Sequence, residues 1–217
     1  MNPVRQSTVS QGHSAPGSLS YLIVPGWNGS GPDHWQRHWE RTLPRAHVVE
    51  QGRWDRPTLR EWVDGLDRAL AAIPGQVVLV GHSLGCITVA HWSEVRDARR
   101  VAGALLVAPA DVDRADRPAA LAPFAPLPLQ PLPFPSLLIA SSDDPAATPG
   151  RARLMAERWG SRFLLLEDVG HINAASGHHR WEEGRELLEN YSRSLTGAAA
   201  RPLSRRHSPE PDRHRLP

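Results

Sequence analysis

The chain of 217 residues contains one cysteine, Cys86, and no lysine. A single cysteine excludes an intramolecular disulfide and a thiolate-rich metal site, so the chain needs no oxidising compartment and we expect a cytoplasmic protein. Long apolar runs are also missing. None approaches the roughly 18 residues of a membrane-spanning helix, and residues 1–19 lack the apolar stretch of a secretory signal. We therefore expect no membrane contact.

Net charge is small, because 25 arginines oppose 23 acidic residues and leave a formal charge of +2, although the isoelectric point is about 9.3. The positive excess lies at the end of the chain, where residues 201–217 hold five arginines and two acidic residues. Without that segment and its charge of +3, residues 1–200 carry −1. The basic isoelectric point therefore reflects the tail, and it gives no support to nucleic-acid binding by the rest of the chain.

The two ends of the chain lack apolar periodicity. Residues 1–19 are rich in Ser, Gln, Gly and Pro, and residues 196–217 mix Ala, Pro and Arg. Neither segment can bury enough apolar surface to offset the entropy lost on ordering, so we expect both to be disordered. Residues 20–195 are then predicted to form one domain of ordinary size.

Within that domain, continuously apolar runs alternate with amphipathic stretches. Unbroken apolar runs are typical of parallel strands covered on both faces. The alternation predicts the α/β class, as a three-layer α/β/α sandwich around a six-stranded parallel sheet. The strands are expected at 21–24, 46–50, 77–80, 103–107, 136–140 and 162–166, and the helices near 33–43, 57–72, 84–97, 147–159 and 179–194.

The connection over residues 109–135 breaks this alternation, with eight prolines in 27 residues. Proline is excluded from helix interiors and central strands, so one interpretation is a rigid surface connector. A second is a lid-like wall of a substrate site with an apolar lining of Phe124, Leu127, Leu129 and Phe134. A third, a polyproline ligand for SH3-like domains, depends only on loosely spaced prolines.

The most informative motif is G-H-S-L-G at residues 81–85, which lies between an expected strand and an expected helix. This is G-x-S-x-G in the strand–turn–helix context that gives the motif meaning. A tight turn at Ser83 needs small neighbours, and it would expose the hydroxyl at the carboxyl end of the sheet. The Leu84 N–H, at the helix N-terminus, could then stabilise a developing oxyanion. We take Ser83 as the candidate nucleophile; the alternative is an ordinary glycine-rich turn.

A serine nucleophile requires an acid and a histidine later in the chain. His171 follows the sixth expected strand, and the pair Asp143 and Asp144 follows the fifth, so all three reach the edge where doubly wound sheets build their sites. We favour Asp144 as the acid because Pro145 fixes the exit of its loop. Asp143 remains an alternative, as does Asp168 in the loop of the histidine itself.

The loop after the first strand reads P-G-W-N-G-S-G at residues 25–31 and is expected to face the Ser83 turn. The backbone N–H of Trp27 is the candidate second oxyanion donor. Its three glycines also suggest a dinucleotide site, but the G-x-G-x-x-G spacing is absent. The candidate substrate-pocket residues, from this loop, the next helix and the proline-rich connection, are Trp27, Asn28, His34, Trp35, Phe124 and Phe134.

With these residues in place, the sequence resembles the α/β-hydrolase superfamily, and more narrowly the small serine hydrolases typified by retinoblastoma-binding protein 9 and bacterial YdeN. The resemblance implies the strand order 2-1-3-4-5-6, no large cap, and Asp144 as the acid. The long proline-rich connection departs from the family, in which that connection is more helical. The similarity covers residues 20–194 and is carried by V-P-G at 24–26, His34-Trp35, Asp55, Pro57, Trp62, G-H-S-L-G at 81–85, S-x-D-D-P at 141–145 and G-H-I-N at 170–173.

These observations predict an enzyme, a serine hydrolase of small carboxylic esters (EC 3.1.1) or small amides that works through an acyl-enzyme intermediate. It would need no metal or cofactor. Its expected partner is the small-molecule substrate, with no nucleic acid and no membrane, and the chain would be a monomer or a small homo-oligomer. The alternative is a protein-interaction module on a hydrolase fold with vestigial activity, because a fold alone does not guarantee activity. Cys86 is disfavoured as a nucleophile because it lies three residues into the helix.

Overall fold

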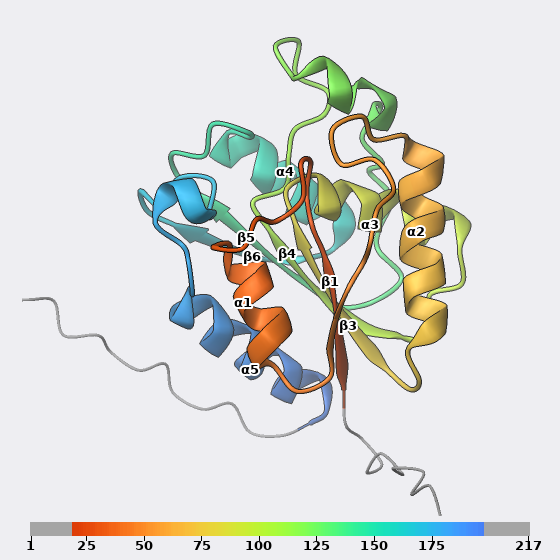
Figure 1. Cartoon of the computed structure of the whole chain (residues 1–217). Coiled ribbons are helices and arrows are strands. Elements are labelled where there is room, and N and C mark those ends of the chain that lie inside the picture. Colours follow the sequence, from red (N-terminus) through yellow and green to blue (C-terminus); the bar gives the residue numbers. More distant parts are fainter. Residues whose placement is uncertain (1–18, 198–217) are drawn as a thin grey trace, which may run out of the picture.

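The computed structural model describes residues 19–197 (Figure 1). The two terminal segments expected to be disordered therefore lie outside the described residues, except for Leu19, Thr196 and Gly197. Six strands form one sheet in the order β2-β1-β3-β4-β5-β6, with every neighbouring pair parallel. This confirms the expected order. The strands are β1 (Ser20–Val24), β2 (Ala46–Val48), β3 (Val77–His82), β4 (Val101–Val107), β5 (Ser136–Ser141) and β6 (Arg162–Leu166).

Helices cover both faces of the sheet, which gives the expected three layers. Within residues 19–197 they are α1 (Trp35–Thr42), α2 (Leu59–Ala72), α3 (Leu84–Val95), α4 (Pro149–Trp159) and α5 (Glu182–Leu195), with short 3₁₀ helices η1 (Ala119–Phe124) and η2 (Ala174–Ser176) in loops. One buried cluster lies between the sheet and α2, α3 and α4, and a second lies between the sheet and α1 and α5. Figure 1 shows α2 and α1 on opposite sides of β1.

Local sequence signals explain where several helices begin and end. Thr58 caps α2, accepting from the Glu61 N–H at 3.4 Å, and its hydroxyl donates to the Glu61 carboxylate at 2.8 Å. Thr148 caps α4, whose first residue is Pro149, and Gly160 ends that helix in the left-handed conformation. Side-chain caps of this kind satisfy amides that have no partner inside the helix.

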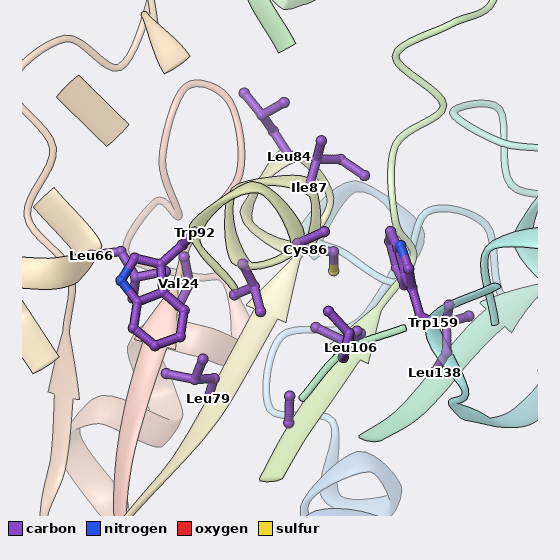
Figure 2. Packing of buried hydrophobic residues seen from close by; sticks show 14 of the residues in the cluster. Val24, Leu66, Leu79, Leu84, Cys86, Ile87, Trp92, Leu106, Leu138 and Trp159 are labelled. Atoms are coloured by element: carbon purple, nitrogen blue, oxygen red, sulfur yellow. The ribbon is translucent and has the colours of Figure 1, made fainter. Parts of the chain in front are cut away.

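The first core is built from alternate residues of the central strands (Figure 2). Leu79 of β3 lies beside Trp92 of α3, Leu106 of β4 lies below Cys86 of α3, and Leu138 of β5 lies near Trp159 of α4. Each such side chain contributes about 1.5–3 kcal/mol to the free energy of unfolding through burial. The strands β3 and β5 are buried along their whole length, whereas the edge strands β2 and β6 are partly exposed. An edge strand has one neighbour and keeps part of its surface exposed, but β6 is still covered on both faces, because Phe163 and Leu165 pack against the first core and Leu164 and Leu166 against the second.

The proline-rich connection is held against the body of the domain. The indole N–H of Trp159 donates to the Pro128 carbonyl at 2.8 Å, and the Tyr191 hydroxyl donates to the Pro135 carbonyl at 2.7 Å. Phe124 is fully buried and packs edge-on against Trp62, with ring centroids 5.6 Å apart. The apolar side chains of this connection thus complete the first core. No helix among residues 19–197 is long and apolar enough to span a membrane.

Candidate active site

Ser83 lies in the turn between β3 and α3 with a φ of 55° and a ψ of −122°. This backbone conformation is strained for a residue with a Cβ atom, and it persists only where the surroundings enforce it. The Ser83 N–H donates to the Val107 carbonyl at 3.0 Å, and the Ser83 carbonyl accepts from the Cys86 N–H at 3.0 Å. The turn is therefore tied to both β4 and α3.

Both flanking glycines lie close to other backbone atoms, and the contact at Gly85 leaves no room for a side chain. A Cβ atom on Gly85 would lie 2.1 Å from the Val24 carbonyl oxygen, and one on Gly81 would lie 3.2 Å from the Cys86 nitrogen. Any side chain at position 85 would force α3 away from the end of β1. The G-x-S-x-G spacing thus follows from the packing of the turn between two strands and a helix.

His171 joins Ser83 to Asp144 by hydrogen bonds. Its Nε2 atom lies 3.0 Å from the Ser83 hydroxyl oxygen, and its Nδ1 atom lies 2.8 and 3.0 Å from the two carboxylate oxygens of Asp144. An ionised carboxylate only accepts, so Nδ1 carries the proton and Nε2 is free to accept from the Ser83 hydroxyl. The Asp144 side chain is 3% exposed and the His171 side chain 18% exposed. This arrangement can move a proton from Ser83 to the imidazole while the buried carboxylate stabilises the resulting charge.

The two other acids that the sequence left open do not contact the imidazole. Asp143 accepts from the Ser141 hydroxyl at 2.6 Å and from the Gly170 N–H at 2.7 Å, and these hydrogen bonds lower its pKa. The Asp168 carboxylate accepts a hydrogen bond from the Ser142 hydroxyl at 3.3 Å, and the Asp168 N–H donates to the oxygen of that hydroxyl at 2.9 Å. Both acids instead connect the loop after β5 to the loop that carries His171.

His82 adds a contact that sequence reasoning missed. Its Nε2 atom lies 2.9 Å from the His171 carbonyl oxygen, to which it must donate, and its ring centroid is 4.9 Å from that of His171. Burial, and secondarily the imidazoles of His171 and His34, lowers the pKa of His82 well below its ordinary value. A neutral His82 retains one N–H, and that N–H fixes the backbone of His171. The signal available in the sequence was a histidine inside the Ser83 motif.

His34 lies on the other side of His82, at a centroid distance of 4.9 Å. Burial, with smaller contributions from His171 and His178, lowers the pKa of His34 to about 4. Its Nδ1 atom accepts from the Gln36 N–H at 3.2 Å and so caps α1. His34 therefore serves as a neutral support beneath the site rather than as a wall of it.

The loop after β1 passes directly against the Ser83 turn. A Cβ atom on Gly26 would lie 2.8 Å from the Ser83 Cβ and 3.4 Å from the Leu84 nitrogen. Leu84 is the first residue of α3, where an amide has no acceptor inside the helix. Trp27 follows Gly26, and its indole N–H donates to the Asp55 carbonyl at 3.1 Å. The two candidate oxyanion amides thus belong to segments in direct contact.

Gln36 is a second residue that supports the site and that sequence reasoning missed. This side chain is fully buried, and its amide donates to the carbonyls of Val24 and Val80 at 3.4 and 3.2 Å. Its carbonyl oxygen accepts from the Ser30 hydroxyl at 2.6 Å. Gln36 therefore fastens the loop after β1 to the ends of β1 and β3. A polar residue on the buried face of α1 was the only signal for it.

A cavity of about 360 Å³ opens at Ser83 and His171. Its remaining walls come from Trp27, from the segment between Ala110 and Leu121 of the connection after β4, and from Pro145 and Ala146 after β5. The first half of the proline-rich connection therefore forms a wall of this cavity, but the apolar lining expected for it is wrong. The first core contains or packs against all four of the expected lining residues, Phe124, Leu127, Leu129 and Phe134, and none of them lines the cavity. That wall carries polar and charged side chains together with Leu121.

Most of the expected pocket residues lie elsewhere. Of the six, Trp27 lines this cavity. Trp35 is fully buried in the second core and donates its indole N–H to the Ile172 carbonyl at 2.8 Å. His34, Phe124 and Phe134 are also buried, the two phenylalanines in the first core, and Asn28 is exposed on its loop. None of these five lines the cavity, because core packing takes up Trp35, Phe124 and Phe134, His34 caps α1, and Asn28 is exposed to solvent.

Cys86 is buried at the start of α3, and its thiol donates to the Val107 carbonyl at 3.4 Å. Burial raises the pKa of this thiol far above its ordinary value, so it has no thiolate character. Among residues 19–197, no three His, Cys, Asp or Glu side chains gather in a way that could hold a metal ion.

Comparison with known proteins agrees with this architecture. A family model for serine hydrolases matches residues 21–190. The crystal structure of a YdeN-like hydrolase from Pectobacterium atrosepticum is 34% identical, with a TM-score of 0.73, over 82% of this chain and 92% of that one. No curated protein sequence matches the chain.

Two more distant structures share the fold. The ydeN gene product of B. subtilis is 18% identical, with a TM-score of 0.64, over 80% of this chain and 97% of that one. A thermophilic esterase from Thermogutta terrifontis is 18% identical, with a TM-score of 0.60, over 82% and 91% of the two chains. The family match extends over nearly all of the described residues, and the sheet, its strand order and the similar structures agree with it: the chain belongs to the serine hydrolase family and has the α/β-hydrolase fold.

Proposed function

We propose that this serine hydrolase cleaves small carboxylic esters, with Ser83 as nucleophile, His171 as general base and acid, and Asp144 as the carboxylate that orients the histidine. The observation that carries the proposal is the unbroken line of hydrogen bonds from Ser83 through His171 to Asp144 at the edge of a cavity. A volume of about 360 Å³ lies near the small end of ligand pockets and suits a small ester.

In the first half of the reaction, the Ser83 oxygen attacks the ester carbonyl carbon while its proton passes to Nε2 of His171. Asp144 stabilises the imidazolium that results. The tetrahedral intermediate then expels the alcohol oxygen, which takes the proton from Nε2, and an acyl group remains on Ser83. In the second half, His171 removes a proton from water, the hydroxide attacks the acyl carbon, and Ser83 leaves with that proton.

The backbone amides of Leu84 and Trp27 are the proposed donors to the oxyanion. The Leu84 amide lies at the N-terminus of α3, where the helix dipole also favours a negative charge. The close approach of Gly26 to Ser83 supports Trp27 as the second donor, because it holds the Trp27 backbone near the ester carbonyl that Ser83 attacks. Removal of one such donor in other hydrolases costs about 10²- to 10³-fold in kcat.

The test compares two serine variants at the two ends of α3. Ser83→Ala should abolish hydrolysis of 4-nitrophenyl butyrate, and Ser93→Ala should leave it unchanged, because the Ser93 hydroxyl only donates to the Ala90 carbonyl of its own helix. Thermal unfolding followed by circular dichroism checks that both variants fold. Full ester hydrolysis by Ser83→Ala would contradict the proposal.

A further inference from the structure

Arg117 stands in the cavity wall that also holds Ser83 and His171. It ends a turn in which its N–H donates to the Arg114 carbonyl at 3.3 Å, and its Nη1 donates to the same carbonyl at 3.0 Å. Pro118 and then η1 follow directly, so the backbone on its C-terminal side is rigid. The guanidinium is thus held beside the site by a short and constrained segment.

The other charged side chains of this wall already have ionic partners. Arg114 forms two parallel bonds with Asp116, from Nε to Oδ1 and from Nη2 to Oδ2, both at 2.6 Å. Asp111 accepts from Nε of Arg151 at 3.1 Å. Among residues 19–197, Arg117 has no carboxylate within 4.0 Å. Among the described residues of the cavity wall, Arg117 is therefore a positively charged side chain without an ionic partner.

The hydrogen-bonding groups of Arg117 are also incompletely used. Its Nε atom is buried and has no acceptor among the described residues. A guanidinium only donates hydrogen bonds, and a buried donor without an acceptor destabilises the molecule that contains it. Its planar arrangement of N–H groups matches the two oxygens of a carboxylate. A carboxylate entering the cavity would supply the missing counter-charge and would accept from the guanidinium.

We propose that Arg117 binds a carboxylate of the substrate, so that the preferred substrates are small esters carrying a negative charge on either the acyl or the alcohol side. This inference rests on the proposed ester hydrolysis at Ser83 and names the substrate class for it. Asp111 and Asp116 do not compete for Arg117, because Arg151 and Arg114 engage them. Arg117 is a specificity-determining residue in this account and takes no part in proton transfer.

The experiment uses two matched pairs of esters. For a charge on the acyl side, the 4-nitrophenyl half-ester of adipic acid is compared with 4-nitrophenyl hexanoate. For a charge on the alcohol side, 4-acetoxybenzoate is compared with 4-acetoxybenzamide. In at least one pair, kcat/KM of the unmodified enzyme should favour the charged ester by about tenfold or more, which is the scale of one charge-assisted hydrogen bond.

Arg117→Gln should bring that ratio close to one by lowering kcat/KM for the charged ester more than for the neutral ester, and Arg117→Lys should keep part of the preference. Arg60→Gln removes the same charge from α2, where the side chain is 93% exposed, and should leave the ratio intact. For the unmodified enzyme, the preference should also weaken as ionic strength rises. This last measurement needs no variant, so it tests the proposal even where a substitution impairs folding.

The outcomes separate this proposal from the one on which it rests. Absence of a preference for the charged ester in both pairs, or a preference that survives in Arg117→Gln, would overturn the role of Arg117. If neutral esters are cleaved in that case and a fluorophosphonate labels Ser83, the proposed ester hydrolysis still stands. If neither ester is cleaved and no label appears on Ser83, the proposed hydrolysis itself fails.

Discussion

The buried imidazole of His82 donates its Nε2–H to the backbone carbonyl of His171, at 2.9 Å. His82 directly precedes Ser83 in the chain, so this hydrogen bond connects the Ser83 turn to the backbone of His171, whose imidazole accepts from Ser83. The contact fixes the position of the His171 backbone, and the hydrogen bonds to Asp144 fix the orientation of its imidazole ring. Proton transfer depends on such placement, since a displacement of about 1 Å can cost about a hundredfold in rate.

His82→Phe keeps a flat ring in this space but removes the donor. We expect it to lower kcat for 4-nitrophenyl butyrate by about tenfold to a hundredfold with little change in KM. His82→Gln restores a side-chain N–H and should recover part of the loss. Steady-state kinetics on both variants, with melting temperatures as a folding check, measures the effect. Equal kcat values for His82→Phe and the unmodified enzyme would show that the contact has no positioning role.

The three loop acids near His171 should differ sharply in their effects. Asp144→Asn should lower kcat by on the order of 10³- to 10⁴-fold, because an amide stabilises the wrong imidazole tautomer and not its charged form. Asp143→Asn should cost far less, since an amide oxygen can still accept from the Gly170 N–H. Asp168→Asn should likewise have a small effect. A larger loss of kcat in Asp143→Asn than in Asp144→Asn would assign the acid to Asp143.

The low pKa of His34 predicts a pH-dependent stability. In the unfolded chain His34 titrates near the ordinary value of about 6.5, whereas in the folded protein its pKa is about 4. Between these values the unfolded state binds the extra proton, so this contribution to stability is complete above pH 6.5 and is lost as the pH falls toward 4. At pH 5 the loss should be on the order of 2 kcal/mol.

His34→Asn isolates that contribution, because asparagine also caps helices but does not titrate. The free energy of unfolding in urea, measured at pH 7.5 and pH 5, should fall less between the two pH values in the variant than in the unmodified protein. His82 remains in both proteins, and burial, the main cause of its lowered pKa, is common to both. An identical fall in both would mean that His34 is not held neutral in the folded state.

Two glycines of the loop after β1 offer a matched pair. Gly26→Ala would place a Cβ atom 2.8 Å from the Ser83 Cβ, so the loop or the Ser83 turn must shift, and we expect kcat to drop by at least about tenfold. At Gly31 an added Cβ meets nothing within 4 Å. Gly31→Ala should therefore retain full activity. Equal activity of the two variants in an ester assay would argue against close packing of this loop on Ser83.

The elements and the relative placement of Ser83, Asp144 and His171 could be predicted because each depends on a local pattern. Buried strands such as β3 and β5 read as unbroken apolar runs, and each of the three residues lies in the turn or loop that follows a strand. In a parallel sheet, those strand ends share one edge. Predicting that these three residues lie at one edge of the sheet therefore did not require the lengths of the connections between the strands.

The cavity wall could not be predicted in the same way. An apolar residue in an irregular segment can face the core or a cavity, and no periodicity separates the two. Phe124 packs against Trp62 in the first core, whereas Leu121, three residues earlier, belongs to the same core and also lines the cavity. The free charge of Arg117 depends in turn on how Arg114 and Arg151 pair with their neighbours, which is a property of tertiary structure.

The central claim is that Ser83 is the nucleophile activated by His171. The most direct measurement is mass spectrometry of the intact protein and its peptides after reaction with a fluorophosphonate. We predict one adduct per chain, on the peptide that contains Ser83, with no adduct in Ser83→Ala and a strongly slowed reaction in His171→Ala. An adduct on another residue, or an undiminished adduct in Ser83→Ala, would contradict the account.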